Sequence, residues 1–136
     1  MLIYADGGAL ARVLDPVAES IAWIRFADEV GERLATSPLG LTELRRIADP
    51  RGPRAREVAR AVADRVTVLR FSDQALRTAA MATGAVAPFT AIHLGIAAAH
   101  PDVDTVATYD VMLARVAVIH GLNVVSPGRP DGWWDE

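Results

Sequence analysis

The sequence predicts an α/β fold in which a mainly parallel, five-stranded sheet is flanked by helices. Two observations support this class. Five short apolar segments alternate with longer segments whose apolar residues recur at helical spacing, and right-handed βαβ units place such helices on both faces of a sheet. With 136 residues, of which 51% are hydrophobic, the chain has the size of one domain with an ordinary core. We expect one domain over residues 1–128 and a polar tail over residues 129–136.

Each predicted strand is a short run of apolar or β-branched residues that ends at an acid, a proline or a polar turn. The first is the apolar run before Asp6, which is followed by two glycines. The other four cover residues 34–37, 66–71, 105–109 and 122–125. The fourth runs to Asp110, so that two of the five strands lead directly into an acid.

The predicted helices fill the intervals between these strands. Proline or glycine ends several of them, and Ser72-Asp73 provides a capping pair for another. They cover residues 9–14, 17–30, 39–48, 54–64, 73–83, 91–99 and 111–120. This order leaves no linker and no internal repeat, which agrees with a single domain.

The composition limits the functions that the chain can have. The absence of cysteine excludes disulfides, thiol nucleophiles and cysteine-ligated metal sites. The net charge is −3, but residues 45–77 carry nine arginines against four acids. That segment is either a solvated helix surface or a surface for an anionic partner. No apolar run is long enough to span a membrane and no secretory signal is recognisable, so we expect a cytoplasmic protein with no membrane association.

The two acids that follow strands are the first functional candidates. The carboxyl ends of parallel strands share one edge of a sheet, so Asp6 and Asp110 meet if their strands are neighbours. Glu43, on the helix after the second strand, is a candidate third member. A hard cation such as Mg²⁺ or Mn²⁺ would relieve the repulsion between such carboxylates. The alternative is that each acid merely caps the helix that follows it.

Four short motifs in a fixed order resemble those of the PIN domain, most of all the VapC toxins of bacterial type II toxin–antitoxin pairs. The resemblance extends from Leu2 to Pro127. The matching stretches are Ile3–Asp6 with Ala9-Leu10, Ser37–Leu39 with Thr42–Arg45, Ala91–Leu94, and Thr108–Asp110 with Leu113-Ala114. Each motif is weak alone, and the four together are fairly specific.

The resemblance implies a PIN-like three-layer fold and a metal-dependent endoribonuclease. It assigns Asp6, Glu43 and Asp110 as ligands of one or two Mg²⁺ or Mn²⁺ ions, with which RNA is hydrolysed. It also implies a homodimer that a cognate antitoxin silences in a hetero-oligomeric complex. Operator DNA would be bound only through that antitoxin.

Two departures from the family pattern bear on activity. Thr90 stands where the family has an acid, so we place it in the catalytic group at a weakened fourth position. Gly7-Gly8 replaces a pair rich in hydroxyls after the first aspartate. These departures fit a natural toxin with a weaker metal site, an engineered disarmed enzyme, or a PIN-fold module that binds antitoxin or RNA without cleavage.

Other residues invite functional interpretations with an ordinary structural alternative. Arg45 and Arg46 follow Glu43, so they are either rim residues that contact RNA or antitoxin, or ordinary surface charge. We interpret His93 as a packed or capping histidine rather than a catalytic one. Trp133 and Trp134 are expected to anchor the tail rather than to stack bases. The two glycines after the first strand lack the spacing of a dinucleotide-binding motif.

Overall fold

A five-stranded sheet with the strand order β3-β2-β1-β4-β5 forms the centre of the molecule, and every strand pair is parallel. A computed structural model of the chain describes residues 1–15 and 18–136. The strands are β1 (Leu2–Ala5), β2 (Leu34–Thr36), β3 (Thr67–Val68), β4 (Val103–Ala107) and β5 (Asn123–Val125). The predicted α/β class with a parallel sheet is therefore confirmed.

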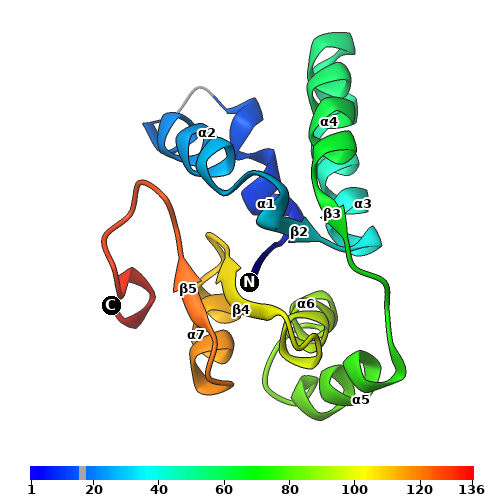
Figure 1. The fold of residues 1–136 in the computed structure, drawn as a ribbon, viewed down its shortest axis with the longest axis vertical. Helices are drawn as coiled ribbons and strands as arrows, with labels where there is room; N and C mark the ends of the chain where they lie inside the picture. The colour runs from blue at the N-terminus through cyan, green and yellow to red at the C-terminus, as the bar shows by residue number, and fades with distance from the viewer. Residues whose placement is uncertain (16–17) are drawn as a thin grey trace.

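Within the residues that the structure describes, seven α-helices connect and cover these strands. They are α1 (Gly7–Leu10), α2 (Ala18–Val30), α3 (Pro38–Ala48), α4 (Pro53–Arg65), α5 (Asp73–Ala82), α6 (Pro88–Ala99) and α7 (Val111–Ile119). Short 3-10 turns follow at Ala11–Leu14, Gly31–Arg33, Asp49–Arg51 and Trp133–Asp135. In Figure 1, α1 to α4 lie on one side of the strands and α5 to α7 on the other. Within the described residues, no helix has the length and hydropathy needed to cross a lipid bilayer.

The alternation of side chains along the strands separates two cores, one on each face of the sheet. Ile3 and Ala5 of β1 belong to the core that α1 to α4 cover, together with Leu10, Trp23 and Leu44. Tyr4, which points the other way, belongs to the core under α5 to α7. The three layers predicted from the sequence are thus helices, sheet and helices.

Two predicted strands were wrong in extent. The segment 66–71 was expected to be a strand, but only Thr67–Val68 pairs with β2, at the edge of the sheet. Val68 and Phe71 are 42% and 45% exposed. Despite their high β propensity, these residues do not form a strand in the core of the sheet. The fourth strand lies at Val103–Ala107 rather than at 105–109. The backbone N–H of Thr108 still donates to the carbonyl of Val125 at 3.1 Å, and its hydroxyl bonds Asp6.

The other element boundaries agree to within a few residues. The first helix begins at Gly7 and becomes a 3-10 turn after Leu10. The predicted start of the next helix at Val17 lies outside the described residues. The tail lies along α7, where the guanidinium of Arg115 donates a 2.7 Å hydrogen bond to the carbonyl of Trp134.

Candidate active site

The register of the sheet brings the two strand-end acids together. β1 and β4 are neighbours, with Ala5 beside Ala107, so the segments after both strands leave the same edge of the sheet. Asp6, Glu43 and Asp110 all line one cavity of about 550 Å³. The sequence-based placement of these three acids in one region is therefore what the structure shows.

Asp6 is buried at the floor of this cavity, with 7% of its surface exposed. Both of its oxygens are held: Oδ1 accepts the backbone N–H of Ala9 at 2.9 Å, and Oδ2 accepts the hydroxyl of Thr108 at 2.7 Å. The first bond caps α1, so Asp6 is both a helix cap and a cavity residue. Burial raises the pKa of Asp6, and the attraction of a charged His93 together with these two hydrogen bonds offsets the rise only in part.

Thr108 connects the two strand-end acids. Its hydroxyl donates to Asp6 and accepts the backbone N–H of Asp110 at 3.0 Å. Asp110 in turn caps α7, because its Oδ1 accepts the N–H groups of Met112 and Leu113 at 2.8 and 2.9 Å. Both bonds fall on Oδ1, which leaves Oδ2 as the oxygen that the capping interaction does not use.

Glu43 reaches the same region from α3. Its Oε1 accepts the backbone N–H of Gly7 at 2.9 Å and lies 2.7 Å from Nε2 of His93. Burial acts to raise the pKa of Glu43, but the hydrogen bond from His93, the attraction of the His93 ring when it is charged, and the hydrogen bond from Gly7 together outweigh it and lower that pKa. Two neighbouring carboxyl groups thus differ in proton affinity, as paired acids at active sites often do.

The walls of the cavity combine basic and aromatic side chains with these acids. Arg12 and Arg46 are its basic lining residues, and Phe89 and Tyr109 are its aromatic ones. The Arg12 guanidinium carbon lies 4.3 Å from the centre of the Tyr109 ring. Burial raises the pKa of Tyr109 to about 12, so its hydroxyl stays neutral at physiological pH.

The remaining predicted site residues lie at different distances from this cavity. Of the two arginines on α3, Arg46 lines it, whereas Arg45 does not belong to its lining. Thr90 lies in the first turn of α6, but the neighbouring Phe89 is the lining residue. His93 is buried, as expected, and its contact with Glu43 was not foreseen. Arg12 was missed, because one arginine carries no distinctive sequence signal. Thr108 belongs to a motif of the family resemblance, but no role was assigned to it.

The donor set can be compared with the preferences of a hard cation. Carboxylate and hydroxyl oxygens are the ligands that Mg²⁺ and Mn²⁺ prefer. Over residues 1–15 and 18–136, however, no three His, Cys, Asp or Glu side chains are grouped closely enough to form a ready-made metal site. The chemistry of the donors fits such a cation. Oε2 of Glu43 and Oδ2 of Asp110 are the carboxylate oxygens that the helix caps, Gly7 and His93 leave available as ligands.

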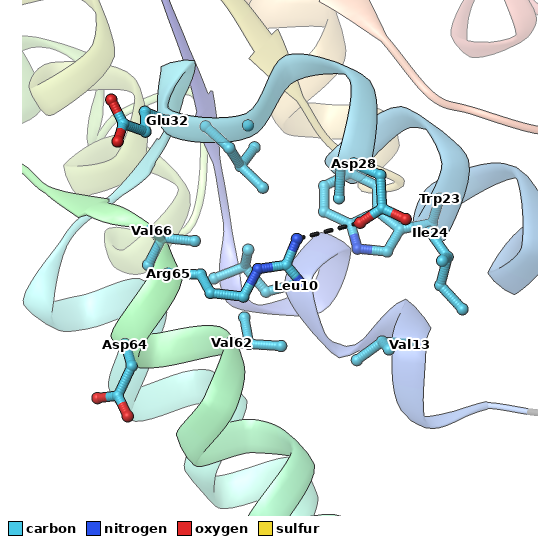
Figure 2. Close-up of a pocket in the computed structure, with 13 residues that line it drawn as sticks. Leu10, Val13, Trp23, Ile24, Asp28, Glu32, Val62, Asp64, Arg65 and Val66 are labelled. Carbon is cyan, nitrogen blue, oxygen red and sulfur yellow. Dashed lines mark hydrogen bonds and ion pairs between the residues drawn. The ribbon is translucent and has the colours of Figure 1, made fainter.

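A second cavity, of about 480 Å³, lies between α2 and α4 (Figure 2). Its walls are mostly apolar: Leu10, Val13, Trp23, Ile24, Ala27, Leu34, Val62 and Val66. Figure 2 shows Arg65 of α4 extending toward Asp28 of α2, and their side chains form a 3.1 Å ion pair. We call this cavity the α2–α4 groove. Ile24 is 41% exposed in it, although the neighbouring Trp23 is buried.

Comparison with known proteins supports the fold. No family model and no curated protein matches the sequence. Two solved structures resemble the chain over nearly its whole length. VapBC2 from Rickettsia felis, bound to a DNA fragment from its promoter, matches with a TM-score of 0.64 and 13% identity, covering 92% of this chain and 98% of that one.

FitAB bound to the IR36 DNA fragment matches with a TM-score of 0.65 and 16% identity, covering 97% of this chain and 99% of the other. At sequence identities this low, the structural similarity shows a shared fold and nothing more specific. The α/β architecture, the parallel sheet order and these two similarities together show that the chain has the PIN-like fold.

Proposed function

We propose that this protein is a VapC-type toxin, an endoribonuclease that needs Mg²⁺ or Mn²⁺ and is neutralised by a cognate antitoxin. One observation carries the proposal: Asp6, Glu43 and Asp110, which the family resemblance assigns as ligands, line one cavity of a PIN-like fold. The similar structures VapBC2 and FitAB were both solved bound to DNA, which agrees with an operator-binding complex in which DNA is reached through the antitoxin.

These three acids would hold the cation, with Glu43 Oε2 and Asp110 Oδ2 the oxygens that the internal hydrogen bonds leave open. When bound, such an ion polarises a phosphodiester and favours in-line attack by water. Arg12 and Arg46 line the same cavity and are suited to bind the phosphates of an RNA strand.

The proposal is tested with purified protein and structured RNA. We expect cleavage in Mn²⁺ or Mg²⁺, none in excess EDTA, and a loss of more than about 100-fold in rate for Glu43→Gln, since replacing residues that only support metal ligands already costs about 10- to 100-fold. Asp102→Asn is the matched control, because Asp102 is an exposed acid outside the cavity. Cleavage that persists in EDTA, or an unaffected Glu43→Gln variant, would refute the metal-dependent nuclease.

Thr90 favours a second candidate function, a PIN-fold module that binds antitoxin or RNA without cleaving it. A threonine has one negative charge fewer than the acid of the family pattern, and the described residues contain no group of three close ligands. Thr90→Asp is expected to tighten Mn²⁺ binding about 10-fold, because it adds a charged oxygen at the N-terminus of α6. Calorimetric titration with Mn²⁺ measures the change. If the variant cuts RNA and the parent does not, the second candidate describes this chain.

The α2–α4 groove is the surface that we assign to the antitoxin. It offers apolar walls to a helical segment, and the ion pair of Asp28 and Arg65 at its edge supplies charges of both signs. Ile24→Asp is expected to weaken antitoxin binding at least about 10-fold, because it puts a charge on an apolar contact. Ile21→Asp is the matched control, since Ile21 is 62% exposed on the same helix but outside the groove. Pull-down with the product of the adjacent reading frame measures both; equal binding by the two variants would contradict the assignment.

The proposal also includes a homodimer. Exposed apolar side chains on α5, among them Leu76 and Met81 at 50% and 88% exposure, provide a surface that a second copy can cover. Sedimentation equilibrium distinguishes the dimer from a monomer.

A further inference from the structure

A chain of buried polar side chains runs from the start of α3 through β1 and α6 to Glu43. The hydroxyl of Tyr4 lies 2.8 Å from Oγ of Ser37 and 2.6 Å from Nδ1 of His93. Nε2 of His93 then lies 2.7 Å from Oε1 of Glu43. Tyr4 and Ser37 are fully buried, and His93 is 3% exposed. Buried polar groups of this kind require that each donor meets an acceptor.

With Glu43 ionised and His93 neutral, only one direction of donation satisfies the whole chain. The backbone N–H of Gly40 donates to Ser37 Oγ at 3.2 Å, so the Ser37 hydroxyl is free to donate to Tyr4. The Tyr4 hydroxyl then donates to Nδ1 of His93, which must be the unprotonated nitrogen, and Nε2–H donates to Glu43. Burial raises the pKa of Tyr4 far above its usual range, which keeps the phenol proton available for donation.

This direction determines which oxygen of Glu43 is engaged. His93 Nε2–H and the backbone N–H of Gly7 both donate to Oε1. The two donors come from different helices, α6 and α1, so Oε1 is held from two sides. A carboxylate fixed in this way presents its other oxygen, Oε2, without having to reorganise.

We infer that Tyr4 and His93 are positioning residues that fix Glu43 with Oε1 engaged and Oε2 open for the divalent cation. The inference rests on the proposed function for the cation. It assigns His93 the Nε2–H tautomer and gives a functional reason for a tyrosine hydroxyl in the centre of the sheet. His93 acts through Glu43 and is not a catalytic residue.

The first experiment does not depend on metal or on activity. The side-chain ¹⁵N shifts of His93 in the metal-free protein are expected to show a protonated Nε2 and an unprotonated Nδ1, with the resonances assigned by comparison with His93→Gln. A protonated Nδ1 with an unprotonated Nε2, or two protonated nitrogens, would overturn the inferred direction of donation.

The second experiment measures Mn²⁺ affinity by calorimetry for the full chain and four variants. We expect Tyr4→Phe and His93→Ala to bind Mn²⁺ about 10-fold more weakly, and His93→Gln to recover most of the loss because its amide can donate to Oε1. His120→Gln, at an exposed histidine after α7, should match the parent. Circular dichroism identifies any variant that fails to fold; for such a variant the ¹⁵N experiment on the parent decides.

Glu43→Gln separates failure of this inference from failure of the proposed function. If Glu43→Gln weakens Mn²⁺ binding while Tyr4→Phe and His93→Ala bind as the parent does, the positioning role is wrong and the metal site stands. If Glu43→Gln itself binds Mn²⁺ as tightly as the parent, the metal site of the proposed function is wrong, and the positioning role toward a cation falls with it.

Discussion

Asp6→Asn is expected to stabilise the metal-free protein at neutral pH and, at the same time, to abolish RNA cleavage. The folded-state pKa of Asp6 is raised by burial. A carboxyl group of this kind stabilises the fold while it is protonated, and that stabilisation is lost as the pH rises through the folded-state pKa. Above that folded-state pKa the folded protein carries a buried carboxylate, which the unfolded chain hydrates at no such cost.

An asparagine avoids this cost and keeps the cap, because its Oδ1 accepts the N–H of Ala9. The Thr108 hydroxyl, which donates to Asp6, would have to turn and accept from the new amide. Denaturant unfolding in EDTA should show that the variant gains free energy of unfolding over the parent as the pH rises from acid to neutral. Cleavage should fall by more than about 100-fold, because the proposed function makes Asp6 a direct ligand of the cation. A variant that is less stable at every pH would contradict the account of Asp6.

Gly7→Ala is expected to be among the most damaging substitutions in the chain. A Cβ at Gly7 would lie 2.2 Å from Cβ of Glu43 and 2.7 Å from the carbonyl oxygen of Gly40. Both distances are far inside van der Waals contact, so α1 and α3 must separate. We expect a loss of about 2 kcal/mol in the free energy of unfolding, a typical cost of overpacking, together with displacement of the Glu43 carboxylate that the Gly7 N–H holds.

Gly8→Ala is the matched control on the same helix. A Cβ at Gly8 would meet only Oδ1 of Asp6, at 3.9 Å, which is ordinary contact. Because alanine is the better helix former, we expect no loss of stability and a gain of up to about 1 kcal/mol. Thermal and denaturant unfolding of the two variants measure the contrast. Equal stability of Gly7→Ala and Gly8→Ala would show that the close approach of α1 and α3 is not required.

The contrast also gives a structural reason for one departure from the family pattern. The position after Asp6 carries no side chain here because Glu43 occupies the space that a Cβ would need. The backbone N–H of Gly7 supplies a hydrogen bond to Glu43 in place of any side chain. The sequence showed the glycine but could not show this contact, since the two residues are 36 positions apart.

The order of strands and helices was predictable because hydrophobic period and turn residues are local signals. These local signals do not predict where a strand ends when contacts with distant parts of the chain determine its length. Val66 to Phe71 has strong β propensity, yet only Thr67–Val68 finds a partner strand, at the edge of the sheet. The predicted fourth strand also included Thr108 and Tyr109, but β4 ends at Ala107, and the Thr108 hydroxyl lies between Asp6 and the backbone of Asp110.

The candidate site was predictable to the extent that sheet topology dictates it. Asp6 and Asp110 line one cavity because their strands are parallel neighbours. The alternation of elements implied parallel strands, whereas the adjacency of these two was left as a condition. The sequence left open whether these acids cap helices or belong to a site. The two interpretations do not exclude each other, because both residues cap a helix and line the cavity. The link from Glu43 through His93 to Tyr4 was not predictable, since it joins three elements through individual side-chain contacts.

The most direct test of the central claim is an anomalous difference map from crystals of the protein grown with Mn²⁺. The account predicts a strong peak in the cavity of Asp6, Glu43 and Asp110, within coordinating distance of Oε2 of Glu43, and no such peak in crystals of Glu43→Gln. A cavity without a peak at saturating Mn²⁺, or a peak held by other residues, would contradict the proposal that this acidic cavity is the metal site of a nuclease.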